Sequence, residues 1–296
     1  MALHGTRPAP THVLAHLSDP HLIAGSGLLH GRIDTRAQLR RALERLEASQ
    51  ERIDAVVISG DLTDNGDELS YALLHEMVLP VVARLGAELV LTSGNHDERG
   101  PLARVLYGQE TAAPQDTVTM LRGLRIIDLD SAIPGYHHGG FDDGQYAWLA
   151  EELATTAQHG TIIVMHHPPI TYRSPTMQLL DFEDVDRLRA ALQGTDVRAI
   201  LSGHLHVTTF GTLGSIPVLV AGGVSYVDDA GAPRELMIAA TGPQSYLLIE
   251  VHPDEVVATV VPIGPHDTWP ALSDDVRDFL DTVPLEDQRE IFSRKR

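Results

Sequence analysis

Cysteine is absent from the chain, which has 296 residues. Its absence excludes disulfide bonds, zinc–thiolate sites and thiol nucleophiles. No hydrophobic run approaches the roughly 20 residues that a membrane-spanning helix needs. The polar segment 1–11 also has no apolar core of signal-peptide length. These absences predict a cytoplasmic protein.

Positive charge is scarce as well. Lys and Arg number 22 against 41 Asp and Glu, which gives a formal net charge of −19. A surface of this sign repels polyanions, so a nucleic acid or an anionic membrane is a poor partner. Hydrophobic residues make up 43% of the chain, enough for a sizeable core.

Short runs of Val, Leu and Ile alternate with helical patterns in the first hundred residues. The runs 12–18, 55–59 and 88–92 predict strands, and the segments 35–49 and 68–85 predict helices. Asp34 is placed to cap the first helix. This alternation is typical of parallel strands joined by right-handed crossovers.

The second half of the chain also alternates strand-like runs with helical patterns. Strands are predicted at 124–129, 161–165 and 197–201, with a helix at 142–154, capped by Asp142 or Asp143, and a weaker one at 182–192. After residue 206, the runs 216–221, 246–251 and 256–261 have short links, which predict antiparallel hairpins.

The predicted fold is an α/β sandwich with two sheets at its core and helices outside, in four layers α/β/β/α. Residues 1–264 would form one large domain. The tail, 265–296, carries prolines at 270 and 284. It would either form a short helix around 274–281 or fray.

Five short segments with metal-ligand chemistry follow predicted strands. They are Asp19-Pro20-His21, Gly60-Asp61-Leu62-Thr63-Asp64, Gly94-Asn95-His96-Asp97, His166-His167 and Gly203-His204-Leu205-His206. Because functional groups in such sheets gather at the carboxyl ends of strands, these segments are expected to converge. Two carboxylates, one amide oxygen and four imidazoles suffice for two metal ions that share a ligand.

Taken singly, each segment has an ordinary explanation. Asp19-Pro20-His21 could be a surface loop, Asp61 a helix N-cap and Asn95 an Asx-turn. Five such segments at five strand ends are hard to explain independently, and together they favour a metal centre. Asp61 is the candidate bridging ligand, since a carboxylate can serve two cations. Of the adjacent pair, His166 is expected to face the site and His167 to lie buried behind it.

The series resembles the calcineurin-like metallophosphoesterase superfamily, whose pattern is D-x-H, G-D-x-x-D, G-N-H-D/E, H and G-H-x-H. All five blocks are present between residues 19 and 206. Within the superfamily the chain looks most like bacterial class III cyclic-nucleotide phosphodiesterases and the related glycerophosphodiesterases, through segments such as 17–22, 134–139 and 166–169. Pro20, where the family usually has Thr, and the unmatched tail depart from the pattern.

The resemblance implies a role for each residue. One ion would be held by Asp19, His21, Asp61 and His206, and the other by Asp61, Asn95, His166 and His204. Iron with manganese or zinc would suit these ligands. His96 would be the catalytic histidine that protonates the leaving group, with Asp64 orienting it. The nucleophile would be a hydroxide bridging the ions, since coordination lowers the pKa of water from about 15.7 to about 7.

Substrate contacts are expected from Asn95, His96 and His206 and, on a loop, from His137 and His138, whose alternative is a solvent-exposed pair. Asn65 stands where protein phosphatases of the superfamily have an arginine that grips a dianion. A singly charged diester is therefore the expected substrate: 3′,5′-cyclic AMP, with cyclic GMP as a second. The alternatives are a glycerophosphodiester or a broader range of diesters and, more remotely, a non-catalytic scaffold. Relatives are often dimers, so self-association is expected too.

Overall fold

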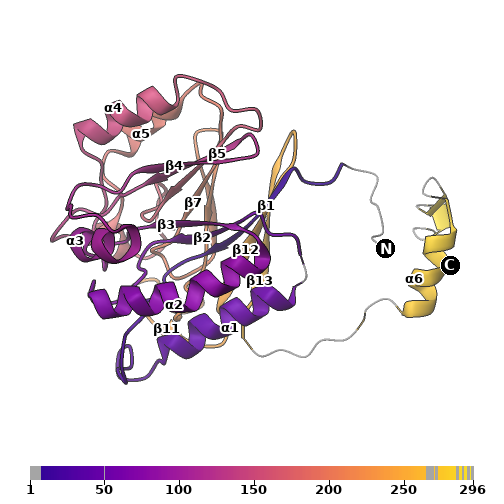
Figure 1. Cartoon of the computed structure of the whole chain (residues 1–296), viewed down its shortest axis with the longest axis horizontal. Helices are drawn as coiled ribbons and strands as arrows, with labels where there is room; N and C mark the ends of the chain where they lie inside the picture. The colour runs from indigo at the N-terminus through magenta and orange to yellow at the C-terminus, as the bar shows by residue number, and fades with distance from the viewer. Residues whose placement is uncertain are drawn as a thin grey trace. The chain divides into compact units, whose positions relative to one another are not determined.

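The computed structural model describes residues 8–49, 51–264, 270, 273–284, 287–288, 290–291 and 294. The stretch from Thr11 to Gly264 forms one compact unit. Two β-sheets make up its core, and helices lie against both (Figure 1). Within the described part of the tail, helix α6 spans Asp274–Thr282.

The first sheet has five strands in the order β13-β12-β1-β2-β3. Their bounds are β1 His12–Leu17, β2 Ala55–Ser59, β3 Glu88–Thr92, β12 Ser245–Val251 and β13 Val256–Pro262. Strands β1, β2 and β3 are parallel, as the alternation of strands and helices predicts. Strand β12 runs antiparallel to both β1 and β13.

The second sheet has six strands in the order β4-β5-β6-β7-β9-β8. Their bounds are β4 Thr117–Leu121, β5 Leu124–Leu129, β6 Thr161–Met165, β7 Val197–Ser202, β8 Thr209–Leu213 and β9 Ile216–Val220. The four central strands are parallel, and the two edge strands are antiparallel to their neighbours. Two short strands, β10 (Val227–Asp228) and β11 (Ala239–Ala240), pair separately.

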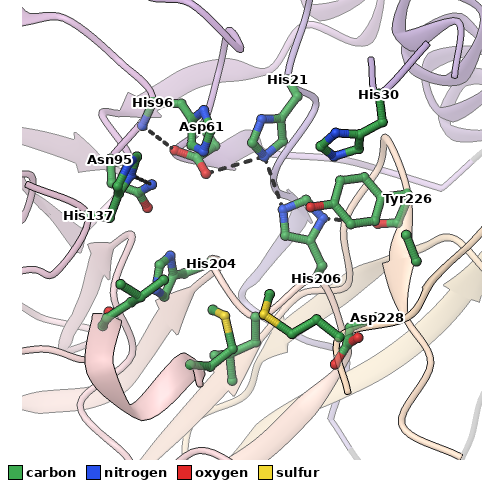
Figure 2. A pocket seen from close by; sticks show the side chains of 15 residues that line it. His21, His30, Asp61, Asn95, His96, His137, His204, His206, Tyr226 and Asp228 are labelled. Carbon is green, nitrogen blue, oxygen red and sulfur yellow. Dashed lines mark hydrogen bonds and ion pairs between the residues drawn. The ribbon is translucent and has the colours of Figure 1, made fainter. Parts of the chain in front are cut away.

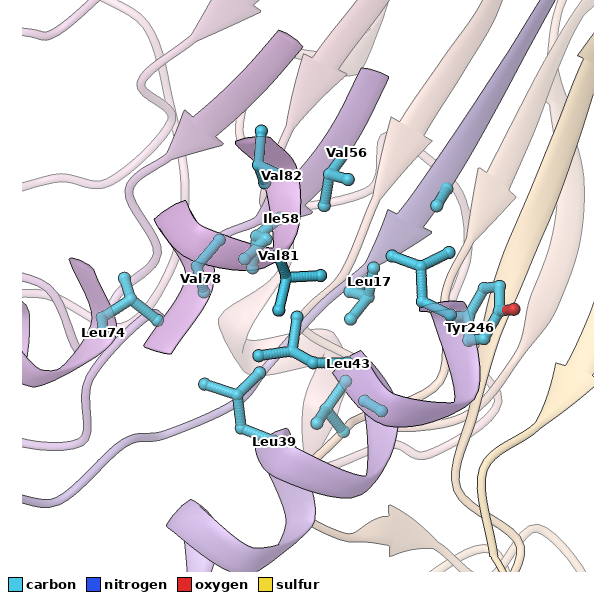
Figure 3. Close-up of a cluster of buried hydrophobic side chains, with 14 of the residues drawn as sticks. Leu17, Leu39, Leu43, Val56, Ile58, Leu74, Val78, Val81, Val82 and Tyr246 are labelled. Atoms are coloured by element: carbon cyan, nitrogen blue, oxygen red, sulfur yellow. The ribbon is translucent and has the colours of Figure 1, made fainter. Parts of the chain in front are cut away.

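Helices α1 (Thr35–Ala48) and α2 (Glu68–Leu85) cover the first sheet, where Leu43 and Val78 belong to the same apolar cluster as Ile58 (Figure 3). Helices α4 (Asp143–Glu152) and α5 (Val185–Leu192) cover the second sheet. Alternate strand residues face inward, so Val57 and Val164 lie in a third cluster between the sheets. The four-layer α/β/β/α prediction is confirmed.

The remaining short helices are α3 (Arg99–Leu102), the π-helix η1 (Ala103–Tyr107) and the 3₁₀-helix η2 (Met177–Leu180). Aspartates cap the long helices: Asp34 accepts a hydrogen bond from the amide of Ala37, and Asp142, rather than Asp143, forms the capping box of α4. Among the described residues, no helix has both the length and the apolarity that crossing a bilayer requires.

The prediction of antiparallel hairpins after residue 206 is confirmed for β12 and β13 of the first sheet. In the second sheet the structure differs, because β9 pairs in parallel with β7. Its antiparallel partner is β8, an edge strand that the sequence did not predict. Gly211 lies in the middle of β8, and glycine weakens the strand pattern.

Candidate metal centre

The five segments meet where strands of the two sheets end. Asp19, Asp61 and Asn95 follow β1, β2 and β3 of the first sheet, and His166 and His204 follow β6 and β7 of the second. The site therefore lies at the carboxyl ends of both sets of parallel strands, as predicted. Figure 2 shows Asp61, Asn95 and His204 around one cavity with His21 and His206.

The backbone is strained at the donor residues. Asp19, His21, Asp61, His204 and His206 have φ angles of 54°, 43°, 46°, 69° and 51°. This left-handed region is unfavourable for residues other than glycine, by roughly 1–2 kcal/mol each. Such strain collects at functional sites, where the surroundings hold the chain in place.

Two glycines allow the segments to approach one another. A Cβ at Gly94 would overlap the main chain and carboxylate of Asp61, and a Cβ at Gly203 would overlap Ser18 and Asp19. Glycine at these positions therefore follows from packing around the donors.

Asp97 braces two of the segments, a role that the sequence reasoning missed. Its buried carboxylate accepts hydrogen bonds from the amides of Leu62 and Gly94, both at 2.9 Å, and from the hydroxyl of Tyr71 at 3.0 Å. Burial, together with the nearby charge of Asp61, raises the pKa of Asp97 to about 6. Its place within the block Gly94-Asn95-His96-Asp97 was the available signal.

The first group of donors is Asp19, His21, Asp61 and His206. All four are buried, and one potential ligand atom from each lies within 4.8 Å of those of the others. Nε2 of His21 is 3.0 Å from Nε2 of His206 and 3.3 Å from Oδ2 of Asp61. Oδ1 of Asp19 is 3.4 Å from Nε2 of His206.

The hydrogen bonds made by the Nδ1 atoms of His21 and His206 show that this group of donors fits a cation. Nδ1 of His206 donates to the main-chain carbonyl of Tyr226 at 3.2 Å, and Nδ1 of His21 lies 3.2 Å from a carboxylate oxygen of Asp64. Both Nε2 atoms are then left with lone pairs that face one another and two carboxylates. A positive charge satisfies this arrangement, and the outer hydrogen bonds are those expected of metal-ligating histidines.

The pKa values agree with a site that attracts positive charge. Burial opposes the charged form of His21, but the Asp61 carboxylate outweighs it and raises the pKa of His21 to about 10. In the same way the pKa of His166 is raised to about 9. Burial disfavours ionised Asp61, yet His166 and His21 hold its pKa well below the usual value. The carboxylates of this site therefore favour positive charge, which a bound cation would supply.

The second group consists of His166, Asn95 and His204, together with Asp61. Nδ1 of His166 donates to the carbonyl of Ser59 at 2.7 Å, and its Nε2 is 3.2 Å from Oδ1 of Asn95. Nε2 of His204 donates to the carbonyl of Leu180 at 2.9 Å, which leaves Nδ1 for a ligand. Burial lowers the pKa of His204 to about 3, so its imidazole is neutral.

Asp61 lies between the two groups. Its Oδ2 is 3.3 Å from Nε2 of His21 and 3.4 Å from Nε2 of His166. Its Oδ1 accepts a hydrogen bond from the amide of His96 at 2.9 Å. The carboxylate is therefore fixed in a position from which it reaches one histidine of each group.

His167 comes as close to His166 and His204 as a ligand would. Both of its ring nitrogens, however, have protein partners: Nδ1 lies 2.9 Å from the hydroxyl of Ser131, and Nε2 lies 3.3 Å from the carbonyl of His137. Its imidazole holds the loop that carries His137.

His96 and Asp64 lie together, but not in the way expected. Nδ1 of His96 donates to the main-chain carbonyl of Asp64 at 3.0 Å, while the Asp64 carboxylate is 3.6 Å away. That carboxylate is closer to His21, at 3.2 Å. The side chain of Asp64 therefore orients His21 at least as much as His96.

The two loop histidines differ. His137 lines the cavity, where its Nδ1 accepts from Nδ2 of Asn95 at 2.9 Å. His138 is not among the residues that line the cavity, because its ring turns to Glu183, with a 3.0 Å contact between Nε2 and Oε1. The structure thus brings His137 to the site and leaves His138 outside it.

The cavity has a volume of about 440 Å³. Sequence reasoning missed part of its lining, namely His30, Met177, Tyr226, Asp228 and Met237. Tyr226 stacks on His206 with ring centroids 4.0 Å apart and planes 22° apart (Figure 2). These residues belong to irregular or very short elements, for which the sequence carries little periodic signal.

Comparison with known proteins identifies the family of the chain. A family model described as calcineurin-like phosphoesterase matches residues 12–208. The chain is 45% identical over 262 residues to a cAMP/cGMP dual specificity phosphodiesterase of Mycobacterium tuberculosis, covering 88% of this chain and 82% of that protein. It is 30% identical over 219 residues to a glycerophosphodiester phosphodiesterase of Enterobacter lignolyticus, covering 70% and 77%.

Among solved structures, a dimetal phosphatase from Danio rerio superposes with a TM-score of 0.60 at 14% identity. The match covers 86% of this chain and 97% of that one. At this identity the likeness concerns the fold alone, and it agrees with the two-sheet architecture.

Proposed function

The chain belongs to the calcineurin-like phosphoesterase family, and we propose that it is a dinuclear metal-dependent phosphodiesterase that hydrolyses 3′,5′-cyclic AMP and cyclic GMP to 5′-nucleotides. The observation that carries this proposal is the position of Asp61, whose Oδ2 lies within 3.4 Å of one histidine from each donor group. A carboxylate so placed suits a pair of cations that share one ligand.

We assign the first ion to Asp19, His21, Asp61 and His206, and the second to Asp61, Asn95, His166 and His204. When bound, the two ions would polarise the phosphate ester and lower the pKa of coordinated water. Nitrogen and oxygen donors without thiolate suit iron with manganese or zinc. The residues themselves keep the donor atoms oriented, because each coordinating imidazole has its other nitrogen hydrogen-bonded to a carbonyl or a carboxylate.

His96 is the proposed catalytic acid. Its Nδ1 is held by the carbonyl of Asp64 at 3.0 Å, so Nε2 is the atom that can pass a proton to the leaving alkoxide. The imidazole is partly exposed at 33% and lines the cavity, which gives it access to substrate. Asn95 and His137 lie next to it and are the proposed phosphate contacts, with His206.

The substrate class rests on two observations. Asn65, an exposed residue, stands where protein phosphatases of this family have an arginine for a dianion, so a singly charged diester is favoured. The relative at 45% identity, which matches 88% of this chain, is named for cyclic AMP and cyclic GMP.

A second candidate is a glycerophosphodiester. The observation in its favour is the relative at 30% identity that is named for this activity. The two candidates share the metal centre and differ only in what must occupy the rest of the cavity.

The proposal has several further parts. Residues 1–264 are taken as the catalytic domain and 265–296 as a tail, and the protein is taken to act in the cytoplasm as a dimer or a larger oligomer. Size-exclusion chromatography with light scattering tests the oligomeric part, which a single monomeric species would contradict.

Steady-state kinetics test the proposal as a whole. Protein loaded with manganese should hydrolyse cyclic AMP and cyclic GMP with a kcat/KM well above that for glycerophosphocholine. A reversed order would favour the second candidate. No hydrolysis of any diester, with no metal bound to the purified protein, would favour a non-catalytic scaffold instead.

A further inference from the structure

The cavity lining contains two unlike sets of residues. One set is made up of metal donors, and the other, which we call the apolar side, consists of the side chains of Met177, Leu180, Leu205 and Met237. Thioether and methyl groups contribute little to the binding of metal ions or phosphate, but they pack well against aromatic rings. The apolar side therefore fits a substrate with a flat aromatic part.

Hydrogen bonds fix the position of the cavity lining relative to the metal donors. The carbonyl of Leu180 accepts from Nε2 of His204 at 2.9 Å, and the carbonyl of Tyr226 accepts from Nδ1 of His206 at 3.2 Å. Each histidine of the 203–206 block is thus joined to a residue that lines the cavity. The distance between a phosphate bound at the metal centre and the apolar side would therefore be fixed.

A polar group belongs to the same cavity lining. Asp228 lies two residues after Tyr226, and its Oδ1 accepts a hydrogen bond from the amide of Ile238 at 3.2 Å. Within the part of the chain that the structure describes, no hydrogen bond is donated to Oδ2 of Asp228. An ionised carboxylate only accepts hydrogen bonds, so this oxygen suits a ligand with N–H donors at its edge.

We propose that Met177, Leu180 and Met237, with Tyr226 and Asp228, form a subsite for the purine base of a cyclic nucleotide whose phosphate lies at the metal centre. This inference rests on the proposed function and names the part of the substrate that the metal ions do not contact. The base packs against the thioethers, and Asp228 accepts hydrogen bonds from its N–H groups.

The chemistry of the base edges makes the role of Asp228 specific. Guanine presents two neighbouring donors, N1–H and the N2 amino group, to one carboxylate. Adenine presents one donor, the N6 amino group, beside the acceptor N1. Asp228 therefore favours guanine over adenine at this edge, and a glycerol group has no ring to place in the subsite at all.

Calorimetric titration of the metal-loaded protein tests the subsite without turnover. The ligands are 5′-AMP, 5′-GMP and ribose 5-phosphate, which carries the phosphate without a base. Both nucleotides should bind at least about tenfold more tightly than ribose 5-phosphate, a difference of about 1.4 kcal/mol. Equal affinities would overturn the subsite even if cyclic nucleotides are hydrolysed. A base-dependent affinity without any diester hydrolysis would instead overturn only the proposed function.

Two variants test whether the contribution of the base to affinity depends on the proposed subsite. Met237 is 54% exposed, so Met237→Ala should fold normally and weaken both nucleotides by about threefold or more, with ribose 5-phosphate unchanged. Met120, 59% exposed on β4 and absent from the cavity lining, gives the matched control Met120→Ala. The proposal fails if both variants have the same effect.

Asp228→Asn tests the polar part. Asparagine replaces one acceptor by a donor, so GMP should lose about tenfold in affinity relative to AMP. If GMP and AMP change equally, Asp228 does not contact the base edge.

Discussion

The Asp64 carboxylate contacts His21 more closely than His96, with separations of 3.2 Å and 3.6 Å from their Nδ1 atoms. The main-chain carbonyl of Asp64 supplies the 3.0 Å hydrogen bond that fixes His96. One residue thus serves both the proposed metal ligand and the proposed acid, through different groups. A substitution of its side chain should affect mainly the metal.

Asp64→Asn should therefore lower metal affinity about 10- to 100-fold, as the loss of an outer partner of a ligating histidine does. With metal in excess, most of the rate should return, because the carbonyl that holds His96 is unchanged. Competition against a chelator measures the affinity. Asp143→Asn is a control, since the Asp143 side chain is 90% exposed on α4. A rate that stays low at saturating metal would mean that the carboxylate acts through His96.

Asp61→Asn should remove activity and metal together. The amide oxygen can still accept from the amide of His96, so the loop should keep its position while both donor groups lose a charged ligand. The rate should fall by more than the roughly 100-fold typical of an outer partner. Elemental analysis of the purified variant should show fewer than the two ions per chain expected for the parent. Full metal content with normal turnover would refute the shared-ligand assignment.

His96→Ala should separate catalysis from metal binding. Metal content should stay at the parental level, while kcat on cyclic AMP falls by about 10²- to 10⁴-fold through loss of the general acid. The loss should shrink on bis(p-nitrophenyl) phosphate, whose leaving group needs no proton. His75→Ala, at an exposed position on α2, serves as the control. A variant that lost its metal would show His96 to be a ligand.

His16 should make the fold sensitive to acid. It is fully buried between the sheets, and its Nε2 lies 2.8 Å from the hydroxyl of Ser59. Its Nδ1 has no hydrogen-bond partner among the described residues. Burial lowers the pKa of His16 to about 3. Because this pKa is lower in the folded protein than in the unfolded chain, His16 takes up a proton at a higher pH when the chain is unfolded. The free energy of unfolding therefore falls as pH drops below about 6.5.

His16→Leu removes this proton uptake. Between pH 8 and pH 5 the parent should lose about 2 kcal/mol more than the variant, from 1.36 kcal/mol for each pH unit below 6.5. Urea unfolding of both proteins at the two pH values gives the difference. An identical pH dependence would mean that His16 titrates alike in the folded and unfolded chain.

The sequence predicted those parts of the site that follow regular strands. Asp19, Asp61 and Asn95 come two or three residues after apolar strands that helices separate, so their convergence followed from the periodic pattern. The bracing role of Asp97 could not be read in this way, because it depends on amides from two loops that meet only in the folded protein.

The residues that line the cavity could not be predicted from the sequence, for a related reason. Tyr226 and Met237 belong to the stretch around the short strands β10 and β11, and Met177 begins a single 3₁₀ turn. Elements this short have no usable period, and their positions depend on hydrogen bonds such as the one from His206 to the carbonyl of Tyr226. The exclusion of His138 likewise depends on its contact with Glu183, 45 residues further along the chain.

The most direct test of the account is a crystal of the protein grown with manganese and measured for anomalous scattering. We expect two peaks about 3.5–4 Å apart, on either side of the Asp61 carboxylate. One peak should be ringed by Asp19, His21 and His206, and the other by Asn95, His166 and His204. A single peak, or two peaks that do not share Asp61, would contradict the proposed centre.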